Sequence, residues 1–339
     1  MKSVFVYCEV ENKKVADISQ ELLSAGKQLA QKLSCPLEAM VFGKDLSEIK
    51  NQIAPYGVDK IFVADDVRLE PYRTLPHAAL ATKILKEENP QIVLFGATSV
   101  GRDLAPRIAS ALNCGLTADC TILDIGDHFA KKEKKEYKDL LYAIRPAFGG
   151  SIMANIINWD MHPQMATVRE GVMKKEIFDA NYTSEIVNVA VDKIVTDEEF
   201  VVKIIERHIE ESGVNLKEAP IIVAGGYGVG SKENFELLQE LAHLLGGEVG
   251  GSRAAVDAGF IEHDRQIGQT GTTVRPKLYI AAGISGAIQH TAGMQESSLI
   301  ISINNDADAP INNLADYVIK GDLNVVIPKM IKYYKANAK

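Results

Sequence analysis

The sequence predicts an α/β protein of two domains, each containing a parallel β-sheet covered by helices. Three observations lead to this prediction. The chain has 339 residues, a length that suits two ordinary domains. Short apolar runs alternate with segments of helical periodicity in both halves. Between the halves, residues 192–219 are charged and show no clear strand pattern, so we expect a helix and a linker there. We therefore place an N-terminal domain at 1–205 and a C-terminal domain at 206–339.

The first half begins with an apolar run, residues 3–10, which we expect to form a buried strand. Residues 16–33 follow with apolar side chains at helical spacing, and they predict an amphipathic helix. The charged run 131–139 is either the solvated tip of a hairpin or a basic docking patch. The remaining expected strands are 37–43, 60–66, 91–98, 117–126, 139–148, 151–159 and 185–191, and the remaining expected helices are 74–88 and about 101–112.

The second half repeats the pattern after Pro220. An apolar strand delivers the glycine turn Gly225–Gly230, and a helix is expected at 233–246. Further strands are expected at 277–283, 299–305 and 316–322, with a final helix at 324–335. Alternation of strands and helices predicts a second, smaller doubly wound domain.

Composition and charge exclude several classes of protein. The chain has 37 basic and 45 acidic residues and a net charge of −8, which disfavours nonspecific binding to nucleic acid. Cys8, Cys35, Cys114 and Cys120 form no CxxC and no zinc-ligand spacing, so we expect reduced thiols and no metal site. No apolar run reaches membrane-spanning length, and the N-terminus shows no targeting pattern. We therefore expect a cytoplasmic protein.

The segment from Gly250 to His290 is the most informative part of the chain. Apart from the apolar run 278–282, it consists mostly of small residues with isolated hydroxyl, amide and cationic side chains. Glycine lets the backbone approach a bound molecule closely, and the polar side chains supply directional hydrogen bonds. A packed core would need bulkier side chains, so this composition predicts the wall of a large cofactor site.

Two glycine turns follow strands of this second domain. The turn Gly225–Gly230 is either a phosphate-binding turn or a plain tight turn, because Ser231 occupies the last glycine position of the strict GxGxxG pattern. A second turn, Gly283–Gly286, leads into a helix that carries Gln289 and His290. Open parallel sheets bind ligands at the carboxyl ends of their strands, which favours a functional over a structural role for His290.

Arg253 has two interpretations. It is either a helix-surface charge that pairs with Asp257, four residues on, or a fixed cation beside a cofactor that gains negative charge on reduction. The chain contains no HExxH motif and no sequence context of a serine hydrolase. Their absence favours a cofactor carrier over a hydrolase.

At this point a family resemblance is evident. Residues 250–322 closely resemble the FAD-binding domain of the alpha subunit of electron transfer flavoproteins, in the words GGSRAAVDAGF, QIGQTG, LYIAAGISGAIQH, AGM, INNDADAPI and ADYVIKGDL. The resemblance extends through the first half in GRDLAPRIASALNCGLTADC and PQMATVREG, so it covers nearly the whole chain. It implies a nucleotide-hydrolase-like N-terminal α/β domain that binds no flavin and contacts the beta subunit, and a doubly wound C-terminal domain that holds one FAD.

The resemblance also implies roles for individual residues. Arg253 and a protonated or hydrogen-bonding His290 would stabilise negative charge on the flavin and raise its reduction potential, and the Thr270 hydroxyl would reach the N5 edge. Asn304 and Asp322 match positions at the adenosine end. The implied cofactor-binding positions are Gly228, Ser252, Arg253, Gln266, Gln269, Thr270, Gly283, Ser285, Gly286, Ala287, Gln289, His290, Asn304, Asp322 and Leu323.

Two positions depart from the family pattern, Tyr227 and His162, each of which stands where many members carry arginine. The implied function is that of an FAD-bearing carrier that passes single electrons between a partner flavin or NADH site and an acyl-CoA-type dehydrogenase. Tyr227 favours the flavin-bifurcating branch. In that branch the beta subunit oxidises NADH and passes one electron to ferredoxin or flavodoxin. The alternatives are a housekeeping carrier, an NAD-dependent enzyme and a non-redox subunit that binds adenine nucleotide.

Overall fold

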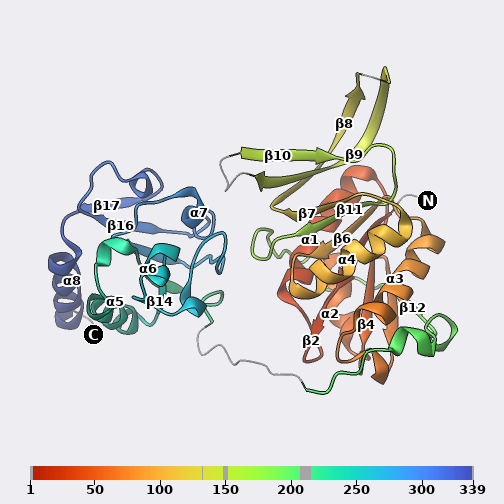
Figure 1. The fold of residues 1–339 in the computed structure, drawn as a ribbon, viewed down its shortest axis with the longest axis horizontal. Coiled ribbons are helices and arrows are strands. Elements are labelled where there is room, and N and C mark those ends of the chain that lie inside the picture. The colour runs from red at the N-terminus through yellow and green to blue at the C-terminus, as the bar shows by residue number, and fades with distance from the viewer. Residues whose placement is uncertain (1–2, 132, 148–151, 207–214, 338–339) are drawn as a thin grey trace. The chain divides into compact units, whose positions relative to one another are not determined.

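The computed structural model describes residues 3–131, 133–147, 152–206 and 215–337. The described residues form two units, and the chain passes from one to the other between residues 206 and 215. Figure 1 shows that each unit is a β-sheet with helices beside it, which confirms the predicted α/β class. The exact boundary at residue 205 stays a prediction, because residues 207–214 lie outside the described residues.

The first unit contains a seven-stranded parallel sheet. Strand β1 lies inside this sheet, paired with β4 on one side and with β6 on the other. Every residue of β1, β4 and β6 is buried, as expected for parallel strands that are covered on both faces. In spatial order the strands are β12 (Glu185–Asn188), β5 (Lys60–Asp65), β4 (Leu37–Gly43), β1 (Val4–Cys8), β6 (Ile92–Gly96), β11 (Gln164–Val168) and β7 (Leu116–Cys120).

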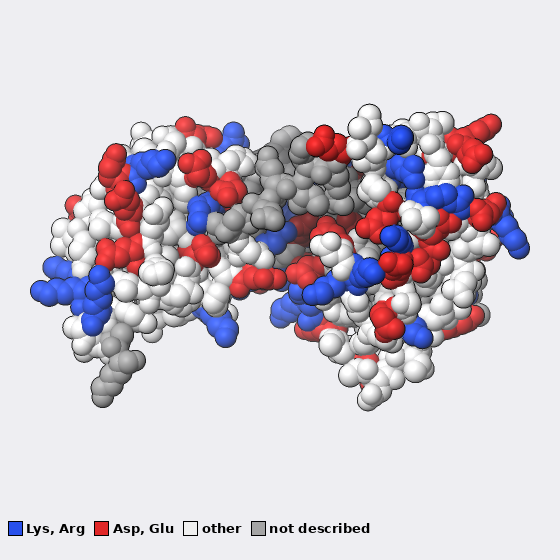
Figure 2. Space-filling view, turned by 90° about the horizontal axis from the view of Figure 1, so that it is seen from below, with Lys and Arg blue, Asp and Glu red and all other residues white. Residues whose placement is uncertain are grey.

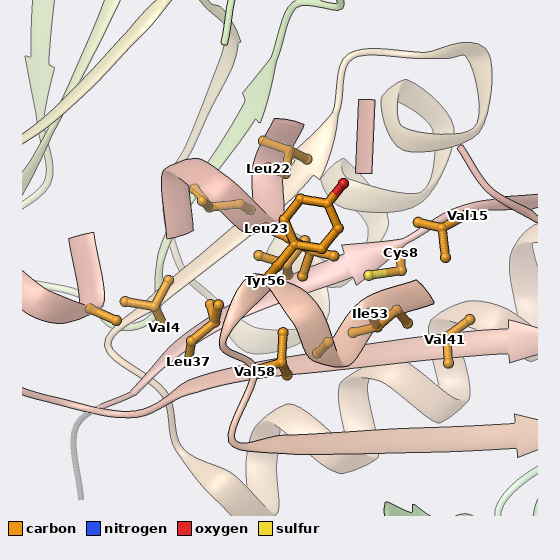
Figure 3. Packing of buried hydrophobic residues seen from close by; sticks show 14 of the residues in the cluster. Val4, Cys8, Val15, Leu22, Leu23, Leu37, Val41, Ile53, Tyr56 and Val58 are labelled. Carbon is orange, nitrogen blue, oxygen red and sulfur yellow. The ribbon is translucent and has the colours of Figure 1, made fainter. Parts of the chain in front are cut away.

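Helices cover both faces of this sheet. The side chains of β1 alternate between the two faces, so the strand contributes to a core on each side. Val4 and Cys8 belong to a core cluster that also holds residues of α1 (Asp17–Leu33) and α2 (Ile49–Ile53). Figure 3 shows part of this cluster, to which Leu22, Leu23 and Tyr56 all belong. On the other face, α3 (Thr74–Glu88) and α4 (Ser99–Leu112) pack on a second cluster that holds the intervening residues of β1.

A three-stranded antiparallel sheet is attached to the first unit. It consists of β8 (Ile122–Ala130), β9 (Lys135–Ala147) and β10 (Ile152–Ile157), and β8 and β9 extend away from the parallel sheet (Figure 1). Ala130 pairs with Lys135, so the charged run 131–139 covers a hairpin turn and the start of β9, as the hairpin interpretation expects. A second small hairpin is formed by β2 (Val10–Glu11) and β3 (Lys14–Val15).

The second unit contains a five-stranded parallel sheet. In spatial order its strands are β14 (Glu248–Gly251), β13 (Ile221–Gly225), β15 (Leu278–Ala282), β16 (Ile300–Asn304) and β17 (Tyr317–Lys320). The order reverses direction at β13, so β13 and β15 are spatial neighbours although β14 lies between them in sequence. Such a reversal leaves a crevice at the carboxyl ends of the two strands, which is where open sheets bind ligands.

The two faces of this sheet are covered differently. On one face α5 (Lys232–Leu245) and α8 (Leu323–Asn337) pack on Val223, Ile280 and Ile303. On the other face the core is closed largely by residues of the connecting loops. The short helices α6 (Arg253–Asp257) and α7 (Ile288–Thr291) follow β14 and β15 and complete the unit.

Three sequence expectations need correction. The described part of 192–219 contains no α-helix; it has short 3₁₀ turns at Val191–Lys193 and Asp197–Phe200 and irregular chain to residue 206, and residues 207–214 lie outside the described residues. The apolar side chains Val201, Val202 and Ile205 are exposed, so tertiary packing does not stabilise a helix there. The single strand expected at 117–126 is divided between β7 and β8 at Thr121. Strands β11 and β14 were not expected, since MAT and VGG lack the bulky β-branched pattern.

The surface carries both signs of charge. On the face shown in Figure 2, acidic and basic side chains are interspersed over both units. None of the helices in the described residues is both long and apolar enough to cross a bilayer.

Candidate cofactor site at the carboxyl ends of the second sheet

A cavity of about 760 Å³ opens at the carboxyl ends of the strands in the second unit. Its walls come from the segments that follow β13, β14, β15 and β16, and from the start of α8. This position is the crevice expected from the strand order, and the volume is within the range of small-molecule sites. The sequence-predicted residues that line the cavity are Gly228, Ser252, Arg253, Thr270, Gly283, Ser285, Ala287, Gln289, His290, Asn304 and Leu323.

The two predicted glycine turns meet backbone to backbone beneath this cavity. The Gly228 amide donates to the Gly283 carbonyl at 3.1 Å. A Cβ on Gly226 would lie 2.1 Å from the same carbonyl oxygen, which is much shorter than a van der Waals contact distance. Gly283 itself has a φ of +60°, which favours glycine. Glycine is therefore required here so that the two turns can approach each other, whatever the cavity holds.

Arg253 pairs with Asp257, as one of its two interpretations expects, and it also lines the cavity; its role beside a cofactor stays a prediction. It is the first residue of α6, and the Ser252 hydroxyl caps that helix by accepting from the Ala255 amide. The guanidinium Nε lies 3.3 Å from Asp257 Oδ2, and both side chains line the cavity. About two thirds of the Arg253 side chain is exposed, so this ion pair is weak and the cation remains available to an anion in the cavity.

Gln266 lies behind Thr270 and outside the cavity lining. The buried Gln266 amide donates to Thr270 Oγ1 at 3.0 Å. Because the threonine oxygen accepts this bond, its own hydrogen stays free to be donated to a group in the cavity. Gln266 orients Thr270, and its predicted contact with the cofactor stays a prediction.

The structure shows His290 hydrogen-bonded, which is one of the two forms considered from the sequence. The imidazole is buried, its Nδ1 lies 3.1 Å from the Ile267 carbonyl oxygen, and its Nε2 lies 2.9 Å from the Tyr279 hydroxyl. Burial lowers the pKa of His290 to about 4, against an ordinary value of 6.5. The side chain lines the cavity as a neutral, hydrogen-bonded ring, so the protonated form considered from the sequence is not the one that this structure favours.

Gln269 and Gly286 are also outside the lining, because they serve the loops around the cavity. The backbone N–H of Gln269 donates to the backbone carbonyl of Gln289 at 2.6 Å and ties the loop to α7. Gly286 has a φ of +91°, and a Cβ there would lie 2.2 Å from the Ile311 nitrogen. These contacts account for glycine at position 286 without a cofactor.

At the far side of the cavity, Asp322 turns away while Asn304 contributes to the wall. Asp322 Oδ1 accepts from the Asn324 amide at 2.8 Å, at the start of α8. The Asn304 amide donates to the Ile284 carbonyl at 2.8 Å and its oxygen accepts from Asp306, so its polar atoms hold two loops together.

Sequence reasoning missed other residues of the wall, although most lie within the motifs already noted. Tyr227 was noted only as a departure from the family pattern, yet it lines the cavity, and its ring stacks on Phe260 with centroids 5.8 Å apart. Asp306 adds a second carboxylate beside Asp257. These residues alternate with small residues in the sequence, and that pattern does not distinguish a residue of the cavity wall from an ordinary loop residue. The remaining missed residues are Gly226, Ala254, Ile267, Gly268, Ile284, Ile303, Asn305, Ala309 and Gly321.

The wall suits a large molecule with a ring and an anionic part. Backbone approaches closely at the glycine turns, hydroxyls are present at Ser252, Thr270 and Ser285, and Arg253 supplies a cation. FAD has these features, so the residues present fit it. Among the residues that the structure describes, no group of three or more His, Cys, Asp or Glu side chains is arranged to hold a metal ion.

Comparison with known proteins gives consistent matches over both units. Residues 4–194 match the family model described as the electron transfer flavoprotein domain, and residues 215–295 match the electron transfer flavoprotein FAD-binding domain. The chain is 46% identical over 337 residues to an electron transfer flavoprotein subunit alpha of Clostridium acetobutylicum, covering 99% of this chain and 97% of the relative.

Two further relatives have different names. A protein FixB of Clostridium saccharobutylicum is 48% identical over 336 residues, with 98% of this chain and 96% of the relative covered. An acryloyl-CoA reductase electron transfer subunit beta of Anaerotignum propionicum is 41% identical over 352 residues, with 98% and 96% covered.

Proposed function

Because the chain belongs to the electron transfer flavoprotein alpha-subunit family, we propose that it holds its FAD in the cavity at the carboxyl ends of β13, β15 and β16. The chain is an FAD-binding electron carrier, and the family pairs it with a beta subunit. This placement of FAD rests on the cavity, which is lined by both glycine turns and by Arg253.

The residues of this chain bind and orient the cofactor. When bound, the flavin ring of FAD accepts and releases electrons. The glycine turns let the backbone lie close to the cofactor, and the Ser285 hydroxyl is exposed in the cavity to donate to it. Thr270 offers a hydroxyl hydrogen that Gln266 has oriented, and Arg253 offers a charge of the sign that favours an anionic cofactor.

Purification of the chain together with its beta subunit tests this placement. We expect a yellow heterodimer whose flavin is FAD and whose absorbance is bleached reversibly by dithionite. Exhaustive dialysis against bromide followed by FAD should remove and restore the colour. A colourless protein that retains NAD would support the NAD-dependent enzyme, and one that retains only an adenine nucleotide without a bleachable spectrum would support the non-redox subunit.

Arg253→Ala should lower the reduction potential of the bound flavin. Removal of the cation withdraws stabilisation from the more negative, reduced cofactor, and a tenfold loss corresponds to about 59 mV for a one-electron step. Anaerobic potentiometry of the heterodimer checks this result. Lys335→Ala, which removes an exposed cation of α8 outside the cavity, is the matched control and should leave the potential unchanged. Equal potentials in both variants would contradict the role of Arg253.

We further propose that the heterodimer belongs to the bifurcating branch and serves an acyl-CoA-type dehydrogenase. Tyr227 at the family arginine position supports the branch, and the name of the Anaerotignum propionicum relative supports an acyl-CoA substrate for the partner. In this branch a second FAD in the beta subunit oxidises NADH, and ferredoxin or flavodoxin receives one of the electrons. Anaerobic NADH titration should reduce a heterodimer that contains about two flavins. One flavin per heterodimer, unreactive with NADH, would instead identify a housekeeping carrier.

The antiparallel sheet is the surface that we expect to contact the beta subunit. Strand β10 contains no charged residue, and its side chains Ile152, Met153 and Ile156 are all exposed. Met153 and Ile157 share one face with Ile144 and Ile122, according to the strand register. An exposed strand with apolar side chains on both faces and no charged residue is an aggregation hazard unless a partner covers it, although Asn155 adds one polar side chain.

Met153→Glu should therefore weaken the heterodimer. A carboxylate buried against an apolar partner surface costs roughly 2 kcal/mol or more, which raises the dissociation constant at least tenfold. Sedimentation of the co-expressed subunits measures the effect. Val67→Glu makes the same type of change at an exposed valine after β5 and is the control. An unchanged heterodimer in Met153→Glu would place the beta subunit elsewhere.

We propose a cytoplasmic location for the chain. Its cysteines are free thiols, and Cys8 and Cys120 are buried, as is usual for proteins of reducing compartments. Subcellular fractionation followed by immunodetection tests this proposal.

A further inference from the structure

The hydrogen bonds around His290 fix the position of its single ring proton. The Ile267 carbonyl can only accept, so Nδ1, 3.1 Å away, must carry the hydrogen. Nε2 then presents a lone pair, and the Tyr279 hydroxyl at 2.9 Å must donate to it. One backbone carbonyl thus determines the direction of both bonds.

Tyr279 is held firmly in this donor role. It is the second residue of β15, a strand that lies between β13 and β16, and its side chain is fully buried. Burial raises the pKa of Tyr279, so the hydroxyl keeps its hydrogen. Its cluster neighbours are apolar side chains such as Ile267, Val274 and Met294.

Those neighbours make the alternative arrangement unfavourable. If Nε2 gained a proton, the Tyr279 oxygen would have to accept it, and the hydroxyl hydrogen would turn toward apolar side chains. A buried hydroxyl hydrogen without an acceptor costs free energy, because its bond to water is not replaced. The tyrosine therefore opposes protonation of the imidazole beyond the effect of burial alone.

We propose that Tyr279 is a positioning residue that holds His290 as the neutral Nδ1–H tautomer in the wall of the cofactor cavity. The inference rests on the proposed placement of FAD in this cavity. His290 then offers neither a positive charge nor a nitrogen-bound hydrogen to the cofactor. Among the described residues that line the cavity, Arg253 is consequently the only side chain with a permanent positive charge.

Side-chain ¹⁵N NMR of the flavin-loaded heterodimer, with histidine labelled in this chain, tests the proposal. The His290 resonances are identified by their loss in His290→Gln. At pH 7 the wild type should show a proton on Nδ1 and a bare Nε2. Tyr279→Phe removes only the donor to Nε2, so its His290 should change to a mixture of tautomers or take up a proton. Tyr7→Phe, at a buried tyrosine of the first unit, is the matched control and should leave His290 unchanged.

Potentiometry of the same variants shows whether the tautomer affects the cofactor. Tyr279→Phe should retain FAD with an affinity within about tenfold of the wild type, and its midpoint potential should rise, because the imidazole can become positive. A merely structural role would weaken binding without altering the tautomer.

Three results would overturn the inference. They are a wild-type His290 with its proton on Nε2 or with a positive charge, a His290 spectrum that is the same in Tyr279→Phe, and a changed spectrum with an unchanged potential. The first needs only the wild type and the His290→Gln variant that assigns the resonances, so it decides even if Tyr279→Phe does not fold. A wild-type heterodimer that lacks FAD would refute the proposed function, whereas the tautomer of His290 would still be measurable on that protein.

Discussion

Gly226→Ala should produce a chain that purifies without FAD. The added Cβ would lie 2.1 Å from the Gly283 carbonyl oxygen and 2.7 Å from the Ile284 Cα, so it strikes backbone from a neighbouring strand end. The two glycine turns can then no longer meet beneath the cavity. Overpacking of this kind costs about 3 kcal/mol, and more where backbone has to move. Flavin absorbance per mole of protein, after size exclusion, measures the expected loss.

The control for this change is Gly246→Ala, at the end of α5. Gly246 has a φ of +71°, and a Cβ there meets no atom within 4 Å. Alanine should cost only the left-handed conformation, roughly 1 kcal/mol, and the protein should keep its FAD. If both variants lose FAD equally, the defect is general instability of the second unit. Full flavin content in Gly226→Ala would show that the turns are not part of the site.

Glu9→Gln should stabilise the first unit at alkaline pH. Glu9 follows β1 and is buried, with the Thr98 hydroxyl donating to its carboxylate at 2.8 Å. Burial outweighs that bond and raises the pKa of Glu9 from 4.5 to about 7. The folded protein therefore binds the proton more tightly than the unfolded chain does. The stabilisation that protonated Glu9 gives to the folded protein is fully present below pH 4.5 and is lost as the pH rises through about 7.

The size of the effect follows from the same values. At about 1.4 kcal/mol per pKa unit, the ionised carboxyl reduces the free energy of unfolding by roughly 3 kcal/mol at pH 8. Glutamine carries no charge and can still accept from Thr98, so Glu9→Gln should recover most of this amount at pH 8. At pH 5 its free energy of unfolding should differ from that of the wild type by less than about 1 kcal/mol.

Urea unfolding followed by fluorescence measures these free energies, since Trp159, the single tryptophan, lies in the first unit. Glu198→Gln, at an exposed carboxylate that is not among the charges acting on Glu9, is the control and should leave the pH dependence of unfolding as in the wild type. A Glu9→Gln variant that is no more stable than the wild type at pH 8 would contradict the assignment.

The parts of the fold that sequence reasoning predicts well are those whose local pattern agrees with their burial. Residues 37–43 form a continuous apolar run, and all seven are buried in β4. Helix α1 starts within one residue of its expected position because its apolar spacing is regular. Strand β11 escaped notice because MAT and its polar neighbours are buried by strands from distant parts of the chain. Such burial depends on tertiary neighbours, which a local pattern does not contain.

The same division applies to the site. The glycine turns, Arg253 and Thr270 lie where strand ends and small residues predict a wall. The position of Gln266 behind Thr270 could not be predicted, because spacing alone does not say which of two nearby polar side chains faces a cavity. The His290 ring is buried and hydrogen-bonded to Tyr279, eleven residues earlier in a strand that the sequence identified only as apolar. Two side chains that the sheet brings together, such as these, cannot be recognised as hydrogen-bond partners from the sequence alone.

The strand order of the second unit has a consequence for the supply of the cofactor in the cell. Gly226 follows β13 and Gly283 follows β15, so the cavity exists only when more than fifty intervening residues have folded. A ligand that binds only the completed fold raises its free energy of unfolding by an amount that grows with the logarithm of the free ligand concentration. Cells starved of riboflavin should consequently degrade this chain by proteolysis, and its abundance should recover when the vitamin is returned to the medium.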